Sequence, residues 1–532
     1  MTPSYLNTIL TILSISPIAY VPTSAAKYSD ARKLRNTANS FRNFLKKKGY
    51  TVRDGNLKFF FTNDDCHAAI DAVGTCFGNN PEANPYGVYQ LPHIPGEAID
   101  DLVPSFGGDR TNDGFGLEIR IRSDEAIVLM GVTPPKAEYF GYTHYLYRSM
   151  DRRIKSDGAE GPTNFTTILA SLDDTLNPTT IRVKQNKKRY KSSFGKDVVI
   201  TTTGHKGTAK DVQKALKQAG VSNKIVNLQK ISIQRNQTSA EFTHTSTGLY
   251  NAGLDADKDT LMLLSRVAIF QNETAGNRYL QNPPVLVFRV TPNQPVTITL
   301  PQPSDDKHTE LTPQPHYPTP NRAERTTRSE EIFRTALDTL ENAVRAAHTI
   351  RENFDAQVLP LDGNHCIRSS ISCVGDNPDT AYAVSATNVT LPQSLTNDES
   401  SSAGYFVVIG VNHAATNSSQ YSELGSIDLR TGTGVASFDN RRMPGSAEPY
   451  LLNETTNDAS GDAAKYLYAI MVRRNCTGIL QRCVEIPSPP TFPNVGFDDP
   501  ILFVFRAVLS PRGLSGPDPS ALLPARVLYA HD

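Results

Sequence analysis

Tryptophan is absent from this chain of 532 residues. Its absence argues against the indole platform on which many proteins stack sugar rings, although 21 tyrosines can offer aromatic faces instead. An excess of charge is lacking as well, because 54 basic residues balance 54 acidic ones. A chain without net charge has no overall field that would attract nucleic acid or an anionic membrane, so we expect no nucleic-acid partner.

Long hydrophobic runs are scarce. The N-terminal one, Ile9 to Tyr20, is followed by Pro22 and by the small residues Ser24 to Ala26, as is typical of the apolar region and cleavage site of a signal peptide. A short membrane anchor is the alternative, but the run is shorter than the roughly 20 residues that a membrane-spanning helix needs. We therefore predict a signal peptide over residues 1–26, secretion to the extracellular space, and no membrane span after signal cleavage.

Common catalytic signatures are missing, since the chain contains neither G-x-S-x-G nor H-E-x-x-H. No two cysteines have the two-residue spacing of a structural zinc site, so we expect no metal centre of that kind. Asp255, Asp257 and Asp259 resemble the start of a calcium loop, but Arg266 stands where such a loop needs glutamate. A weak extracellular calcium site is one interpretation of these aspartates, and the cap of a helix through Leu261 to Ile269 is the other.

Cysteine is sparse but regularly placed, because the six cysteines form three couples that are close in sequence. We predict three local disulfides, although six cysteines allow fifteen connectivities. Each bond would add about 2 to 3 kcal/mol of stability by restricting the unfolded chain, and such bonds persist in oxidising compartments. The predicted couples are Cys66 with Cys76, Cys366 with Cys373, and Cys476 with Cys483.

Acceptor sites for N-glycans agree with secretion. Seven asparagines have the Asn-x-Ser/Thr pattern, and we therefore expect a glycoprotein. They are Asn164, Asn236, Asn272, Asn388, Asn417, Asn453 and Asn475.

An internal repeat organises the chain. The segment CFGNNP at 76–81 returns in the second half as CVGDNP at 373–378, each with a further cysteine upstream and a tyrosine-bearing extended segment downstream. Other landmarks recur in the same order: a buried strand broken at Gly131 or Gly410, and a Phe-Arg strand at Pro284 to Val290 or Pro500 to Ala507. We therefore predict an internal duplication.

The predicted fold class is α+β, with two related β-rich halves that are each preceded by an amphipathic helix. The first half spans residues 27–291 and the second, shorter half spans 327–532. Residues 292–326 form a linker whose eight prolines exclude regular structure. The helix before the second half has an apolar stripe that we extend from Phe333 to Phe354. A strand, a helix and a strand near 197–229 form a βαβ pattern with parallel strands, which we interpret as an α/β insertion in the first half.

Two arginines are the first candidates for a ligand site. Arg289 and Arg506 are each the lone charge in an otherwise apolar strand, and a buried guanidinium needs an anionic partner. An internal ion pair in both halves is one interpretation, and a pair of groups that hold an anionic ligand near the junction of the halves is the other. His144 and His413, which follow the two buried strands, are further candidates.

Asn80 and Asn377 precede prolines within the repeated motif. A residue before proline is pushed toward extended backbone, which leaves the side-chain amide available for other bonds. Fixation of the loop is one interpretation of these amides, and contact with a ligand is the other.

The sequence supports two hypotheses for the function. The first is a secreted glycoprotein enzyme with a cleft between its halves that acts on a small polar or anionic compound. The second is a non-catalytic extracellular binding or surface protein. An enzyme should concentrate histidine, aspartate and arginine in one concave pocket, whereas a surface protein should present a broad exposed patch to an extracellular partner.

We expect the mature protein to begin near Lys27, to carry N-glycans and to contain three local disulfides. Intact-mass measurement before and after deglycosylation, together with peptide mapping without reduction, checks all three points. Free thiols at all six cysteines would contradict secretion.

Overall fold

The computed structural model describes residues 31–73, 76, 85–99, 115–150, 165–183, 193–233, 249–295, 327–359, 361–385, 389–390, 404–451, 465–479, 482–489, 491–496, 499–511, 514–519 and 522–531. The predicted signal peptide lies outside these residues, and so does the predicted linker beyond residue 295. Of the glycan acceptors, Asn272, Asn417 and Asn475 are described, and all three are exposed. The other four acceptors lie outside the described residues.

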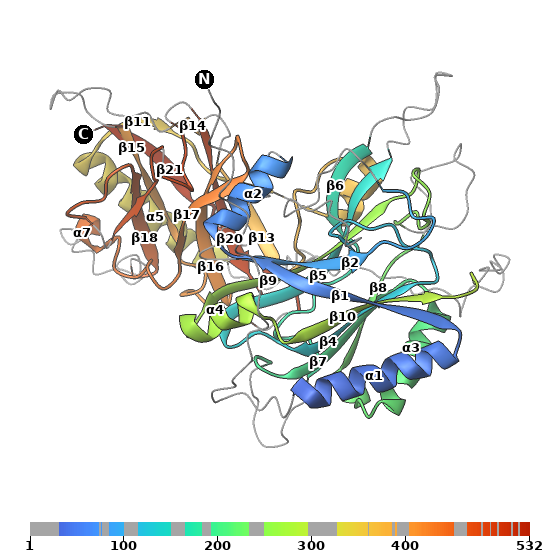
Figure 1. Ribbon diagram of the computed structural model, residues 1–532. Coiled ribbons are helices and arrows are strands. Elements are labelled where there is room, and N and C mark those ends of the chain that lie inside the picture. Colours follow the sequence, from blue (N-terminus) through green and yellow to red (C-terminus); the bar gives the residue numbers. More distant parts are fainter. Residues whose placement is uncertain are drawn as a thin grey trace, which may run out of the picture.

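Within the described ranges the fold mixes seven α-helices with three β-sheets and is rich in β-structure, as predicted (Figure 1). The helices are α1 (Ala31–Lys47), α2 (Asn63–Val73), α3 (Lys206–Gln218), α4 (Glu273–Gln281), α5 (Thr327–Ala347), α6 (Gly363–Ser369) and α7 (Glu448–Leu451). The strands of the first half are β1 (Tyr50–Phe60), β2 (Tyr86–Pro92), β3 (Phe115–Gly116), β4 (Ala126–Val132), β5 (Ala137–Met150), β6 (Phe165–Ser171), β7 (Asp197–Thr203), β8 (Val226–Lys230), β9 (Thr260–Phe270) and β10 (Val285–Pro292). Those of the second half are β11 (Thr349–Asn353), β12 (Gln357–Leu359), β13 (Thr380–Val384), β14 (Val389–Thr390), β15 (Gly404–Val411), β16 (Tyr421–Asp428), β17 (Thr433–Asp439), β18 (Leu467–Arg473), β19 (Cys483–Glu485), β20 (Pro500–Val508) and β21 (Arg526–His531). None of these helices is long and apolar enough to cross a membrane.

The first half builds one sheet in the order β6-β5-β9-β2-β1-β10-β4-β7-β8, with β3 attached to β2. Strand β1 holds the sheet together, because its first six residues pair with β10 and its last five pair with β2. The predicted βαβ unit is present, and its strands β7 and β8 are parallel as expected.

The second half divides the same arrangement between two sheets, β11-β21-β15-β18-β19 and β12-β13-β20-β16-β17. The strand orders of the two halves agree if β11 and β12 together are matched with β1. Strand β13 then corresponds to β2, β20 to β9 and β21 to β10. The parallel pair β18 and β19 takes the place of β7 and β8. A parallel pair of strands is therefore present in both halves. Helix α3 connects the pair in the first half, and the connection in the second half carries the Cys476–Cys483 disulfide.

The strand order also corrects the pairing of the two Phe-Arg strands. Strand β20, which carries Arg506, occupies the place of β9 and not that of β10. The registers agree, because Tyr86 lies opposite Arg266 on β2 and β9, and Tyr382 lies opposite Arg506 on β13 and β20. The residue equivalent to Arg506 is therefore Arg266. The alternative of a helix through Leu261 to Ile269 is wrong as well, because this segment is the central strand β9, buried between β5 and β2.

Helices α1 and α5 each cover one sheet. The apolar stripe of α1 places Phe41 and Leu45 against β4 and β10, and α1 lies beside α3 on the same face (Figure 1). Helix α5 buries Leu340 and Val344 in the core of the second half. The predicted stripe extended too far, because the helix ends at Ala347. Phe354 follows strand β11 instead, and its ring packs against that of Phe406.

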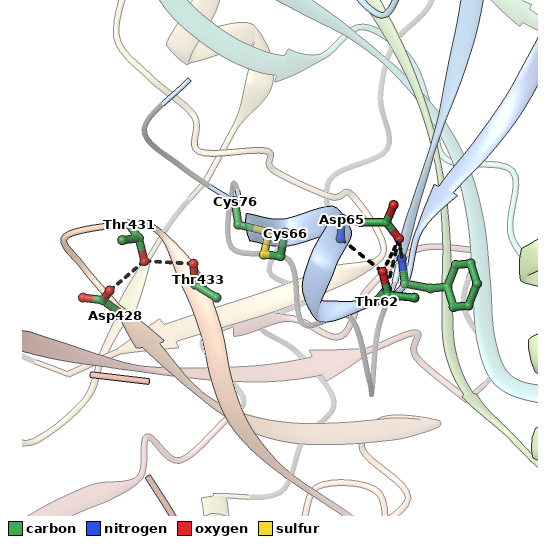
Figure 2. Close-up of a disulfide and its surroundings, with 8 residues drawn as sticks. Thr62, Asp65, Cys66, Cys76, Asp428, Thr431 and Thr433 are labelled. Carbon is green, nitrogen blue, oxygen red and sulfur yellow. Dashed lines mark hydrogen bonds between the residues drawn. A yellow bond between two sulfur atoms is a disulfide. The ribbon is translucent and has the colours of Figure 1, made fainter. Parts of the chain in front are cut away.

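The halves exchange their disulfide-bonded arms. All three predicted cysteine couples lie at disulfide distance. Helix α2 lies beside the second half (Figure 1). The Cys76 amide donates to the Thr431 carbonyl of that half at 2.8 Å. Figure 2 shows the Cys66–Cys76 bond beside the turn that Thr431 stabilises by its hydrogen bond to Asp428. Reciprocally, the Cys373 amide donates to the Ile168 carbonyl of β6 at 2.7 Å.

Candidate functional site

An apolar cleft of about 700 Å³ opens beside the exchanged arms. Strands β1, β2, β5, β6 and β9 form most of its wall. Side chains alternate along a strand, so Met262 and Leu264 of β9 face the cleft, whereas Leu261 and Leu263 face the core of the first half. The arm of the second half contributes Val374, which is 70% exposed and is one of the large apolar side chains at the surface. The cleft is thus built by both halves.

A smaller polar niche of about 290 Å³ continues from the cleft. The two hollows share Tyr86, Tyr145, Leu264 and Gly375 in their walls. The niche adds the hydroxyl groups of several tyrosines and the guanidinium of Arg266. A ligand that spans both hollows would place its apolar part in the cleft and its polar part in the niche.

A buried charge cluster lies at the niche. Arg266 and Arg506 share one carboxylate, that of Glu423, at nitrogen–oxygen distances of 3.5 and 3.7 Å. Arg266 is 7% exposed and Glu423 is 2% exposed. The Tyr421 hydroxyl donates a further hydrogen bond to Glu423 at 2.8 Å. Two guanidinium groups therefore face a single carboxylate in a place where solvent screens charge poorly.

The charge of Arg266 is retained despite its burial. Burial alone lowers the pKa of this guanidinium, but Tyr86 and Glu423 raise it, and the net pKa is above the usual value. Its Nε atom is buried and has no hydrogen-bond partner among the described residues. A buried donor without a partner costs about 1 to 3 kcal/mol, so an anionic ligand that accepts from Arg266 would relieve a real deficit.

Asn377 holds the repeated motif against the first half. Its side chain donates to the Tyr139 hydroxyl at 3.1 Å and accepts from Thr175 at 3.1 Å and from the amide of Asp379 at 3.0 Å. These bonds fix the loop, and Asn377 also lines the niche, so both interpretations of this residue remain open. Asn80 lies outside the described residues.

Asp379, a hydrogen-bond partner of Tyr139 in the niche wall, has a strongly perturbed carboxyl group. It accepts from the Tyr139 hydroxyl and from Asn177, both at 2.8 Å. Burial raises its pKa to about 8, and the hydrogen bonds from Tyr139 and Asn177 offset only part of this effect. The carboxyl group is therefore mostly protonated at neutral pH.

The four candidate arginines and histidines lie in different surroundings. Arg289 is enclosed by Glu97 at 2.6 Å and Glu125 at 2.9 Å, with no exposed surface. His144 is buried, its Nε2 lies 2.9 Å from the Lys230 carbonyl, and burial lowers its pKa, an effect that the charge of Asp173 opposes.

His413 and Arg506 do lie together. They line a further cavity in the second half, where His413 Nε2 lies 3.2 Å from the Leu523 carbonyl. The structure thus brings together one histidine and one arginine of the four. The second half has no ion pair equivalent to that of Arg289, because the register places Tyr529 at the matching position.

The calcium interpretation finds no cluster of carboxylates. Asp259 is fully buried and accepts from the Ser149 hydroxyl and the Asn251 amide, whereas Asp255 and Asp257 are exposed. In the described part of the chain, no three acidic, histidine or cysteine side chains are grouped closely enough to hold a metal ion.

Sequence reasoning missed the residues that carry the charge at the niche, Arg266 and Glu423. Arg266 was assigned to the twelfth position of a calcium loop and to a helix. The sequence nevertheless contains a signal for Arg266, because this residue is a lone charge in an apolar run that resembles the run around Arg506. Glu423 had no such signal, because nothing in the sequence marks which carboxylate faces the two arginines.

We expect Asp379 to make stability fall with rising pH. Its pKa is about 8 in the folded protein and about 3.9 in an unfolded chain, so between these values only the folded state keeps the proton. The free energy of unfolding should therefore fall across this window by up to about 1.4 kcal/mol per pH unit. Asp379→Asn, which cannot ionise, should remove this slope in urea unfolding measured from about pH 5 to about pH 9.

The exposed Asp257→Asn provides the matched control and should keep the pH dependence of the parent protein. Parallel stability curves for the parent and Asp379→Asn would contradict the assignment.

Comparisons with known proteins supply no family. No family model matches the chain, and no curated protein matches it. Two solved structures align over most of it with a TM-score of 0.34. One is the VPA0106 protein from Vibrio parahaemolyticus, at 10% identity over 94% of this chain and 98% of that chain. The other is an uncharacterised protein from Burkholderia cenocepacia, at 8% identity over 94% of this chain and 88% of that chain.

Proposed function

We propose that this protein is a secreted glycoprotein that binds a small amphipathic anion in the cleft between its halves. The buried cluster of Arg266, Arg506 and Glu423 carries the proposal, because two guanidinium groups share one carboxylate beside an open niche. A carboxylate or sulfonate on the ligand would accept from Arg266 and balance the second positive charge. The adjoining apolar cleft would take an aromatic or aliphatic body.

Secretion is supported by the three disulfides and by the exposure of three glycan acceptors. Closely spaced disulfides are typical of proteins that fold in an oxidising compartment. The apolar N-terminal run followed by small residues is the further support in the sequence.

We also propose that the two halves derive from an internal duplication. The common strand order, the matching Tyr-Arg register pairs and the reciprocal exchange of disulfide arms support it. A further support is backbone strain at equivalent positions: Ile269 and Leu509, which follow the two arginines at the same distance, have φ angles of 52° and 53°.

Superposition of the halves in an experimental structure is the check on duplication. We expect Arg266 to fall on Arg506 and Tyr86 on Tyr382 when the sheets are aligned without reference to sequence. Equivalent strands whose registers differ by one residue would contradict a common origin, because such a shift moves every side chain to the opposite face.

Catalysis in the same niche is the second candidate function. Tyr139 lines the niche, and its hydroxyl is hydrogen-bonded to Asp379, whose pKa is raised to about 8 by burial. A carboxyl group that titrates near neutral pH is suited to general acid–base chemistry. Turnover of nitrophenyl esters that Asp379→Asn abolishes would favour this candidate, and saturable binding without turnover would favour the first.

We expect the parent protein to bind anilinonaphthalene sulfonate, an aromatic anion of suitable shape, with Arg266 as its main charged contact. Arg266→Gln should weaken this binding about tenfold, equivalent to about 1.4 kcal/mol, because a charge-assisted hydrogen bond is lost. Fluorescence titration measures the affinity.

The matched ligand is N-phenylnaphthylamine, which has similar rings but no charge and should bind the parent and Arg266→Gln equally. Arg441→Gln, at an exposed arginine, is the matched protein control. Equal binding of the anion by the parent and Arg266→Gln, with melting temperatures unchanged, would contradict the proposed function.

A further inference from the structure

Helices α1 and α3 concentrate positive charge on a chain that is neutral overall. They lie side by side over one face of the sheet of the first half, and their apolar sides are buried in one core cluster (Figure 1). Their outward sides are rich in lysine and arginine. Ten exposed basic residues belong to these helices and the turns that follow them, six within residues 32–48 and four within residues 210–224.

Little of this charge is neutralised within the fold. Helix α1 contains no acidic residue, and α3 contains one, Asp211. The Asp211 carboxylate lies 3.7 Å from the ammonium group of Lys214. The half-buried Arg42 of α1 pairs with Asp54 of β1. Among the described residues, the other nine exposed cations make no ion pair with a carboxylate.

The helix that leads the second half has the opposite charge character. Helix α5 contains three arginines and four acidic residues. Its acidic side chains pair within the fold, because Arg526 of β21 lies 2.5 Å from Glu341 and 2.6 Å from Asp338, and Glu341 also lies 2.8 Å from Arg345. A helix that covers a sheet in this protein therefore does not need an excess of positive charge, and the excess on α1 calls for another explanation.

The two basic helices meet at one end. Tyr50, shortly after the C-terminus of α1, donates its hydroxyl to Asp211 in the second turn of α3 at 3.1 Å. The lysines of residues 46–48 therefore lie at the same end of the layer as Lys214. The 17 residues of α1 extend over about 25 Å. A small anion would contact only one or two of the cations on such a face, whereas a linear polyanion would contact many at once.

The side chains of this face restrict the kind of polyanion. Among the large apolar side chains that are exposed in the described part of the chain, none belongs to α1 or α3. Proteins that bind single-stranded nucleic acid stack its bases on aromatic side chains, and helices that bind a membrane surface insert an apolar face. Neither contact is available here, because the apolar sides of both helices are packed in the core.

We infer that the outer face of α1 and α3 binds an acidic polysaccharide. Its repeated sulfate or carboxylate groups would pair with lysine and arginine, and no aromatic or apolar contact is required. The choice of a polysaccharide over duplex nucleic acid rests on the proposed secretion, whereas the charge of the face does not. The face is also separate from the proposed anion niche, because neither helix contributes to the niche wall.

The test uses heparin, a sulfated polysaccharide, as the probe and the full-length protein. Calorimetric titration should show saturable binding to the parent that weakens as salt is added, because binding releases counterions. The triple variant Lys46→Gln, Lys47→Gln and Lys48→Gln should bind about tenfold more weakly at about 0.15 M salt. Its slope of log affinity against log salt concentration should be smaller by about 2 to 3, roughly one for each lost contact.

A second triple variant examines the other helix. Lys210→Gln, Lys214→Gln and Lys217→Gln should reduce the affinity and the salt dependence in the same way. This variant gives an independent result if the first does not fold. Uncharged dextran, which has no groups to pair with these cations, should not bind the parent.

The matched control removes three charges from the second half. Arg351→Gln, Arg430→Gln and Arg441→Gln change exposed arginines, and this variant should bind heparin as the parent does. Arg266→Gln should also bind heparin normally, which separates this face from the anion niche. Absence of saturable heparin binding to the parent would overturn the inference, and so would parental affinity in both folded lysine variants. Tighter binding of duplex DNA or of phosphatidylserine vesicles than of heparin at the same salt concentration would overturn the assignment to a polysaccharide.

Discussion

One carboxylate at the junction of the halves, that of Glu423, lies between Arg266 of the first half and Arg506 of the second. Removal of these three groups from water costs several kcal/mol per ion, and distances of 3.5 and 3.7 Å recover this cost only in part. At Arg289, by contrast, short hydrogen bonds to Glu97 and Glu125 compensate the buried charge within the fold. The cluster at Glu423 is looser, and among the described residues its two guanidinium groups share this one carboxylate. If the proposed anion binds here, the geometry of this junction would link the assembly of the halves to its binding.

The exchanged arms reinforce this link. Val374 and Gly375 of the second half complete the wall of a cleft that otherwise belongs to the first, and the Cys66–Cys76 arm lines the same cleft from its attachment on the second half. A ligand in the cleft would contact both arms at once. Since a ligand stabilises the state to which it binds better, occupancy should favour the docked arrangement of the arms. The disulfides keep each arm compact, so that most of the ordering cost is met before any ligand arrives.

The sequence predicted the parts of this fold that depend on local chemistry. The three cysteine couples, the helices α1 and α5 and the parallel pair β7 and β8 all follow from spacing and periodicity. The sequence-based prediction failed where two segments have similar sequences but different surroundings in the fold. A lone arginine in an apolar strand is enclosed by two glutamates at Arg289, yet lines an open niche at Arg266, and the difference lies in residues far away in sequence. For the same reason, no local pattern could identify Glu423 or Asp379 as partners at the site.

The niche and the further cavity beside His413 each involve adjacent positions on one strand. Gly141 and Phe140 of β5 correspond in register to Glu423 and Ser422 of β16. Because successive side chains on a strand point to opposite faces, one position of each pair faces the junction and the other faces the interior. In the first half glycine leaves the junction face open as the niche, where a β-carbon would collide with the Tyr139 hydroxyl, and phenylalanine fills the interior. In the second half glutamate pairs with both arginines at the junction, and it lines the further cavity together with serine. Two neighbouring differences between otherwise matching strands thus accompany the niche in the first half and the further cavity in the second.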